Sequence, residues 1–203
     1  MITVPRKDFS FIIKKLKVAP TFVYSVLDST IQGTVLADSS DYNALLIHTK
    51  AGLYYITGQV TNKLLENLVA IFEERVDKGE RFTLFSYTPI WSQVIEQYFN
   101  EDLRKIERYA FSFDLLTYKN RKRNEVHDYE ISKITSSIVE YSQEFNKKYY
   151  DEYWDSINNF LENGFGFCLI DNQRIISEAV SIFKCNNYAE IDIVTDLNYR
   201  GEG

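Results

Sequence analysis

The chain has 203 residues, of which 45% are hydrophobic and 15% aromatic, and its formal net charge is −6. This length suits one large domain or two small ones, and so hydrophobic a composition with only 3 prolines excludes a disordered chain. The acidic balance argues against a general nucleic-acid binder, and the apolar runs are shorter than the ~20 residues of a membrane span. We therefore expect a globular protein that binds neither nucleic acid nor membrane.

The first part of the chain alternates helices with strands, which predicts an α/β fold. Residues 61–78 show the clearest helical pattern, because apolar side chains recur there every three or four positions. Thr88 and Pro89 are typical of an N-cap and a first helical position, so another helix begins there. The full series is one or two helices within 7–28, strands at 34–38, 44–48, 53–57 and 82–85, helices at 61–78 and from Thr88, and a strand at 106–118.

Two of these elements come with a predicted orientation. The helix that begins at Thr88 should bury Ile90, Trp91, Val94, Ile95, Tyr98 and Phe99. The strand at 106–118 should present Tyr109, Phe111 and Phe113 on one side.

Residues 119–128 form a polar, charged stretch without core side chains, and we place a domain boundary there. Its basic residues are interpreted as part of a solvated linker, with a contact to an anion or a nucleic acid as the alternative. The boundary separates an N-terminal α/β domain, 1–118, from a second domain, 129–203. The second domain should contain a strand at 129–134, a helical stripe of Ile134, Ile138, Tyr141 and Phe145, a helix from Asp151 to Gly164, and strands at 166–170, 175–183 and 189–195. The short turns between the last three strands predict an antiparallel meander.

The sequence does not show the residue patterns that are typical of several classes of enzyme. His48 and His127 are its 2 histidines, and neither belongs to a nucleophile–base pattern. We find no metal-binding motif and expect no metal. Cys168 and Cys185 lie in apolar, strand-like stretches, so we interpret both as reduced core residues of a cytoplasmic protein.

The strongest functional pattern lies in the last fifteen residues. The alternating strand at 189–195 leads into a turn and then into Arg200-Gly201-Glu202-Gly203. Glycines let a backbone approach a ligand closely and direct its N–H groups to an anion, and Arg200 adds a positive charge. A strand that leads into such a loop is typical of a pyrophosphate site at the start of a helix. An ordinary strand-to-helix turn is the alternative interpretation of this motif alone.

The order of elements after residue 128, together with Arg200-Gly201-Glu202-Gly203, resembles the first half of the GNAT N-acetyltransferase fold, whose fourth strand enters the motif Arg/Gln-x-x-Gly-x-Gly/Ala. Several short sequence motifs are similar to those of the GNAT-like family that includes the zwittermicin A resistance acetyltransferase. That similarity rests on Glu190-Ile191-x-Ile193-x-Thr195, Tyr199 to Gly203, Gly166-Phe167-Cys168 and Ile176-Ser177-Glu178. The resemblance implies an α/β (α+β mixed-sheet) protein with an N-terminal α/β domain ahead of a GNAT domain.

This resemblance also implies an activity, namely acetyl-CoA-dependent transfer of an acetyl group to a small-molecule amine by direct attack. The backbone of the strand would pair with the pantetheine arm, and the N–H of Val194 or Thr195 would polarise the thioester carbonyl. The cofactor-binding residues implied in this way are Ile193, Val194, Thr195, Arg200, Gly201, Glu202 and Gly203.

The acceptor amine must lose a proton, so a base is expected. Glu190 and Asp192 are the candidates, because they lie two residues apart on one strand and so share a face. Glu178, on the neighbouring strand, is a third and weaker candidate. A carboxylate base near a cofactor cleft needs a raised pKa. The alternative is that Glu190 and Asp192 simply face solvent, and no general acid is assigned.

Two other functions stay open. One is a catalytically inactive GNAT-like binding or regulatory module, and the other is a scaffold in which residues 1–118 bind a partner through exposed tyrosines and phenylalanines.

A GNAT sheet continues beyond its fourth strand, so the strand at 189–195 should have an exposed edge and an apolar face. We expect the sequence to be a piece of a longer chain, truncated within the pyrophosphate loop, or to borrow elements from a partner such as a second copy.

Overall fold

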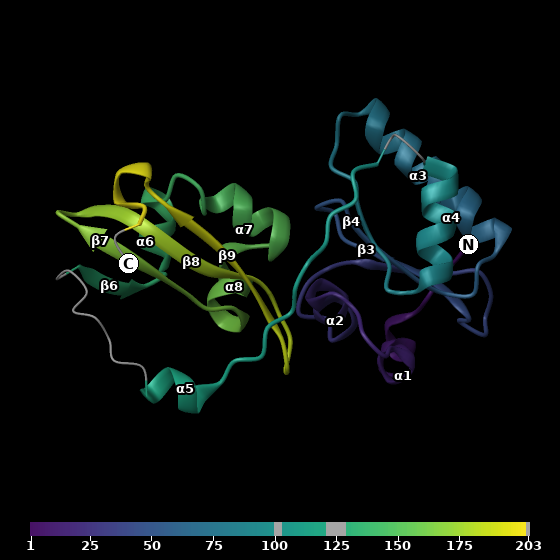
Figure 1. Ribbon diagram of the computed structural model, residues 1–203, viewed down its shortest axis with the longest axis horizontal. Helices are drawn as coiled ribbons and strands as arrows, with labels where there is room; N and C mark the ends of the chain where they lie inside the picture. Colours follow the sequence, from purple (N-terminus) through teal and green to yellow (C-terminus); the bar gives the residue numbers. More distant parts are fainter. Residues whose placement is uncertain (100–102, 121–128, 202–203) are drawn as a thin grey trace.

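The computed structural model describes residues 1–99, 103–120 and 129–201, and these form two separate sheets with helices packed on them (Figure 1). We call residues 1–99 the first half, 103–120 the connecting segment and 129–201 the second half. The predicted α/β fold is confirmed. Most of the predicted boundary at 119–128, including His127, lies outside the described residues, so the boundary stays a prediction. Within the described ranges no helix is long and apolar enough to cross a membrane.

The first half contains a five-stranded mixed sheet. Its strands, in their order across the sheet, are β1 (Ile2–Thr3), β2 (Thr34–Ala37), β3 (Ala44–His48), β4 (Leu53–Gly58) and β5 (Thr83–Phe85). The first four pair antiparallel, whereas β5 runs parallel to β4. A parallel neighbour requires a crossover, which helix α3 (Asn62–Asp77) provides. Each strand predicted between residues 34 and 85 is present.

Helices cover both faces of this sheet. Leu45 and Ile47 of β3 pack in one buried cluster with residues of α1 (Phe9–Lys15) and α2 (Thr21–Leu27). Ala44 and Leu46 pack in another cluster with residues of α3 and α4 (Pro89–Phe99). Because alternate residues of a strand point to opposite faces, β3 is buried on both sides and reads as a continuous apolar run.

Helix α4 buries a narrower stripe than its sequence predicts. Trp91 and Phe99 are buried, and the indole Nε1 of Trp91 donates to the carbonyl of Gly58 at 3.0 Å. Ile90 and Tyr98, which were also expected inside, are exposed. Only one side of α4 meets the sheet and α3, so residues at the margins of its apolar face remain in solvent.

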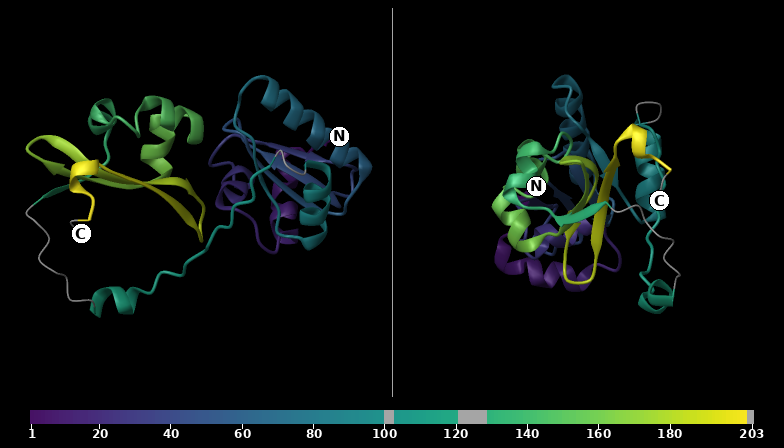
Figure 2. Two further views of the ribbon diagram at one scale, coloured as in Figure 1. Left: turned by 45° about the horizontal axis from the view of Figure 1, so that its top comes forward. Right: turned by 90° about the vertical axis from the view of Figure 1, so that its left-hand side faces the viewer.

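The connecting segment corrects one prediction. Residues 103–114 form neither helix nor strand, and the expected strand at 106–118 is replaced by helix α5 (Leu115–Asn120). Phe111 is 91% exposed, and Tyr109 and Phe113 are also exposed, so no sheet pairs with this alternating stretch (Figures 1 and 2). Asp114 starts the helix instead, because its carboxylate accepts hydrogen bonds from the N–H groups of Leu116 and Thr117 at 2.9 and 3.1 Å.

The second half contains a four-stranded sheet in the order β6-β7-β8-β9, antiparallel throughout, as the predicted meander requires. Its elements in chain order are β6 (Glu130–Lys133), α6 (Ser136–Tyr141), α7 (Lys147–Tyr153), α8 (Ile157–Asn163), β7 (Gly166–Asp171), β8 (Arg174–Lys184), β9 (Ala189–Thr195) and the 3-10 helix η3 (Leu197–Tyr199). The α-helices of this half lie on one face of the sheet (Figure 2). The other face bears the exposed side chains of Ile131, Phe167, Ile191 and Ile193.

The helical part of this half differs from the prediction in its boundaries. The single helix expected from Asp151 is two helices, because Asn146 and Ser156 each cap a new N-terminus by accepting a backbone N–H. Between them Asp155 has a φ of +65°, which no α-helix can include. Tyr141, expected on the buried stripe, is exposed.

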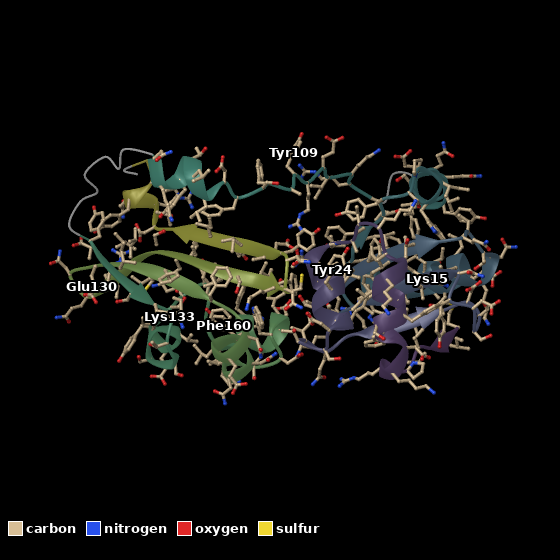
Figure 3. The ribbon with its side chains drawn as sticks, turned by 90° about the horizontal axis from the view of Figure 1, so that it is seen from below. Lys15, Tyr24, Tyr109, Glu130, Lys133 and Phe160 are labelled. Carbon is tan, nitrogen blue, oxygen red and sulfur yellow. The ribbon has the colours of Figure 1, made fainter. Side chains whose placement is uncertain are left out.

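The two halves share one buried cluster. Phe22 of α2 and Phe183 of β8 are both buried, with ring centroids 6.0 Å apart. Tyr24, which lies where the halves meet in Figure 3, stacks on Tyr188 at 5.7 Å. Polar contacts reinforce this junction: Asp155 accepts the N–H of Gln32 at 2.6 Å and pairs with Lys50 at 3.1 Å.

Candidate active site

Strand β9 holds most of the residues that the sequence singles out. It is the outermost strand of the second sheet among the described residues, and it pairs with β8 alone. Val180 of β8, on the helix-covered face, is the cross-strand partner of Asp192. Glu190 and Asp192 therefore point toward the helices. Ile193, which is 65% exposed, points to the opposite face.

Glu190 forms an ion pair with a residue of the connecting segment. Its Oε1 lies 2.6 Å from Nη1 of Arg108, which donates the hydrogen bond. The side chain of Glu190 is 23% exposed and that of Arg108 is 57% exposed. Glu190 therefore sits at the edge of the junction, where a solvent-borne molecule can reach the pair.

Asp192 is held by a tyrosine of α7. The hydroxyl of Tyr149 donates to Oδ2 of Asp192 at 3.2 Å, and the N–H of Ile193 donates to Oδ1 at 3.0 Å. Burial raises the pKa of Tyr149, and the negative charge of Asp192 raises it further. Tyr149 therefore stays protonated and acts as a hydrogen-bond donor to the carboxylate.

Glu178, on β8, is the most enclosed of the three candidate carboxyl groups, with only 4% of the residue exposed. Its Oε2 accepts a hydrogen bond from Ser142 Oγ at 2.8 Å, whereas its buried Oε1 has no partner among the described residues. Burial raises the pKa of Glu178, and the hydrogen bond from Ser142 partly opposes that rise. The hydroxyl of Tyr150 is also buried without a described partner, and burial followed by the charge of Glu178 raises its pKa.

The outer edge of β9 pairs with no other strand among the described residues. The carbonyl of Val194 accepts from Ser177 Oγ at 3.1 Å, and the N–H of Asp196 donates to the carbonyl of Ile176, so these residues face β8. Successive residues of a strand direct their backbone groups to opposite edges. Thr195 therefore faces the outer edge, where its carbonyl accepts from Arg200 Nε at 3.2 Å.

The start of the predicted pyrophosphate loop follows directly. Gly201 has a φ of +88°, which favours glycine, and among the described residues other than its chain neighbours no heavy atom lies within 4 Å of the position that a β-carbon would take. Arg200 is exposed beside it. Glu202 and Gly203, the other two predicted loop residues, lie outside the described residues. The described part of the loop thus has a left-handed backbone at the glycine, next to an exposed arginine.

The structure also shows which groups sequence reasoning missed. Arg108 and Tyr149 contact the two carboxylates of β9, although they lie 82 and 43 residues away in the chain. No local motif marks either residue, so only the folded chain brings them to the site. The burial of Glu178 did have a signal, because Ile176, Glu178 and Val180 alternate along a strand whose apolar members face the helices.

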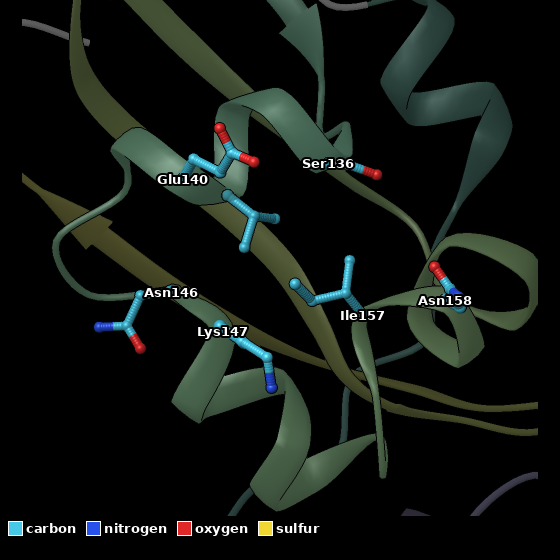
Figure 4. A pocket seen from close by; sticks show the side chains of 7 residues that line it. Ser136, Glu140, Asn146, Lys147, Ile157 and Asn158 are labelled. Carbon is cyan, nitrogen blue, oxygen red and sulfur yellow. The ribbon is translucent and has the colours of Figure 1, made fainter.

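A cavity of about 370 Å³ lies elsewhere, within the helix layer of the second half. Figure 4 shows its lining, which comes from α6 and from the starts of α7 and α8. The lining residues are Ser136, Val139, Glu140, Asn146, Lys147, Ile157 and Asn158. None of the residues predicted on β8, β9 or the loop takes part. Nor do the described residues include a cluster of three or more potential metal ligands.

Comparisons with known proteins show the family of this chain. The family model described as GNAT acetyltransferase matches residues 13–203. "Uncharacterized N-acetyltransferase YdfB" of Bacillus subtilis (strain 168) is 38% identical over 189 residues, which cover 92% of this chain and 72% of that protein. The crystal structure of a GCN5-related N-acetyltransferase-like protein from Streptococcus suis 89/1591 shares the fold, with a TM-score of 0.71 and 20% identity over 97% of this chain and 79% of that chain. The chain therefore belongs to the GNAT acetyltransferase family and, by that membership, is an N-acetyltransferase.

Proposed function

We propose that the protein transfers the acetyl group of acetyl-CoA to the amine of a small molecule by direct attack. One observation carries this proposal beyond family membership. Strand β9 presents Glu190 and Asp192 on one face, has an outer edge that no other described strand pairs with, and leads into Arg200-Gly201. A carboxylate, a free strand edge and an anion-binding turn are the three parts that such a transfer needs.

The described residues suit acetyl-CoA as co-substrate. The backbone of Ile193 and Thr195 would hold the pantetheine arm along the outer edge of β9, whereas Val194 between them faces β8. Between Val194 and Thr195, the N–H of Thr195 is the better candidate to polarise the thioester carbonyl, because Val194 faces β8. Arg200 and Gly201 would contact the pyrophosphate, together with Glu202 and Gly203.

The chemistry assigned to the chain is a proton transfer coupled to acyl transfer. Acetyl-CoA supplies an acetyl group that is activated as a thioester. Glu190 or Asp192 accepts a proton from the acceptor's ammonium group, and the free amine attacks the carbonyl carbon. A C–N bond forms and the C–S bond breaks. The nitrogen, positively charged after the attack, gives up its second proton, and the leaving thiolate of coenzyme A takes up a proton. Tyr149, which donates to Asp192, keeps that carboxylate oriented during the exchange.

The test measures thiol release from acetyl-CoA in the presence of tyramine, putrescine, spermidine or kanamycin. We expect at least one amine to be acetylated, and the variant of the true base, Glu190→Gln or Asp192→Asn, to lose about 100-fold in kcat. Glu130→Gln is the matched control, because Glu130 is an exposed carboxylate on the opposite edge strand of the same sheet. Unchanged rates in both variants would remove both residues as bases. A folded protein that acetylates no amine would count against the proposal.

A non-catalytic binding or regulatory module is the second candidate. The observation in its favour is that both carboxylates of β9 already have partners, Arg108 for Glu190 and Tyr149 for Asp192. A module of this kind would bind acetyl-CoA without releasing the thiol. Calorimetric titration with acetyl-CoA, run beside the rate assay, separates the two candidates.

We infer a reducing, cytoplasmic setting from the cysteines. Cys168 is buried, Cys185 is half-buried, and both thiols are free. Unpaired cysteines in apolar surroundings are typical of proteins from reducing compartments. Cell fractionation of the tagged protein tests this location.

A further inference from the structure

We propose that Arg108 is a positioning residue for Glu190, so that the connecting segment takes part in the acetyl transfer carried out by the second half. This inference rests on the proposed function, in which Glu190 is one of the two candidate bases. Arg108 precedes the predicted domain boundary at 119–128, whereas every site residue predicted from the sequence follows that boundary.

The contact fixes one oxygen of the carboxylate. Nη1 of Arg108 lies 2.6 Å from Oε1 of Glu190, a short distance that is typical of a charge-assisted hydrogen bond. A guanidinium donates from a rigid planar fork, so the bond restricts the rotation of the carboxylate as well as its position. The acceptor amine would then meet a carboxylate with a defined direction.

Arg108 is itself held in place by the first half. Its guanidinium lies over the ring of Phe85, with 5.5 Å from Cζ to the ring centroid. Tyr87 lies two residues after Phe85 in the chain, and both charges of the ion pair act on its phenol. Burial is the main cause that raises the pKa of Tyr87. The charge of Arg108 lowers this pKa, and the charge of Glu190 raises it. Phe85 of the first half therefore contacts the arginine of the ion pair directly.

A parallel connection reaches the other candidate base. Arg81 of the first half donates from Nη1 to the hydroxyl of Tyr153 at 2.8 Å. The ring of Tyr153 lies 4.9 Å from that of Tyr149, whose hydroxyl donates to Asp192. Both carboxylates of β9 are thus connected to an arginine from outside the second half, one directly and one through two tyrosines.

The experiment replaces Arg108 in the whole protein and uses the panel amine that is acetylated fastest. Arg108→Gln should lower kcat roughly tenfold, because a displaced catalytic group loses reaction geometry. Arg108→Lys, which keeps the charge, should recover part of that loss. Lys105→Gln should leave kcat unchanged, because Lys105 belongs to the same segment but pairs with Glu96 of the first half at 2.8 Å. Thermal midpoints of all variants show whether folding is retained.

The decisive measurement repeats Arg108→Gln in the Glu190→Gln background. If Arg108 acts through Glu190, the second substitution has no further effect on kcat, because coupled residues are not additive. An equal tenfold loss in both backgrounds would mean that Arg108 acts independently, and it would overturn the inference. An unchanged kcat in Arg108→Gln would also overturn it, and so would an unchanged kcat in Glu190→Gln, because Arg108 would then have no base to position. Failure of the unaltered protein to acetylate any amine would instead reject the proposed function.

Discussion

At the scale of single residues, Glu178 is the group whose environment and chemistry conflict most. Its carboxyl lies inside the second half with one oxygen bonded to Ser142 and the other without a described partner. Burial penalises the charged form, so the folded-state pKa is raised above the ordinary value of 4.5. The folded chain then keeps a proton that the unfolded chain has lost. Stability therefore falls as the pH rises from the ordinary glutamate value through the raised one.

Glu178→Gln removes this conflict, because an amide can still accept the hydrogen bond from Ser142 but never becomes charged. We compare the free energies of unfolding of the variant and of the unaltered protein at pH 5 and at pH 8. The difference, variant minus unaltered protein, should be larger at pH 8 than at pH 5. Urea denaturation at the two pH values measures this difference. Glu130→Gln, at an exposed carboxylate, should show no such rise. A relative stability that falls with pH would contradict the raised pKa.

The sequence predicts one part of the site and not the other. Glu190, Asp192 and the turn at Gly201 follow from a strand pattern and a local motif within twelve residues. Their partners Arg108 and Tyr149 come from a different segment and a different helix. Such contacts depend on how the halves pack, which no local periodicity specifies. The roles of all of these residues stay predictions until the variants are measured.

At the scale of elements, helix α3 shows how a capping residue sets a boundary. Thr61 has an extended backbone, and its hydroxyl accepts the N–H of Leu64 at 3.3 Å. Threonine at this position satisfies one of the N–H groups that a helix start leaves without a partner. Leu64 and Leu68 follow on the buried face, so the cap and the apolar stripe agree.

Thr61→Ala should therefore lower the free energy of unfolding by about 1 kcal/mol. Thr61→Ser is the matched control, because serine keeps the hydroxyl and caps at least as well. Urea denaturation followed by far-UV circular dichroism gives both values. Equal losses in the two variants would show that the hydroxyl contributes nothing.

Elements with strong local patterns were predicted well, and the connecting segment was not. Helix 61–78 and the meander strands combine periodicity with caps or turn residues, so several local signals agree there. The stretch 106–118 alternates aromatic and polar residues like a strand, but a strand forms only where a partner offers hydrogen bonds. No such partner is present among the described residues, and the hydrogen bond that Asp114 accepts from Leu116 starts helix α5 instead.

At the scale of the whole molecule, we expect the two halves to fold as one unit, because they share a buried cluster. Phe22, Phe183 and their neighbours are buried between them, so unfolding either half would expose the apolar surface of the other. Each half also contains one of the 2 tryptophans, Trp91 and Trp154, and both are buried. The chain therefore has a separate optical probe in each half.

We expect these probes to report a single transition. In Trp91→Phe the remaining fluorescence comes from Trp154 in the second half, and in Trp154→Phe it comes from Trp91 in the first. Within each variant, the denaturation curve followed by fluorescence should coincide with the curve followed by far-UV circular dichroism. Comparing the two probes inside one variant cancels any change in stability that the substitution causes. Separate midpoints would show that the halves unfold independently.

The shared cluster also has a consequence for how this sequence can change over generations. The rings of Phe22 and Phe183, and those of Tyr24 and Tyr188, meet across the junction. A substitution at one member of a pair alters the space left for the other, so the tolerated replacements at both positions depend on one another. The two halves can thus accept substitutions at their outer surfaces independently. At the junction, however, the paired positions are expected to change together.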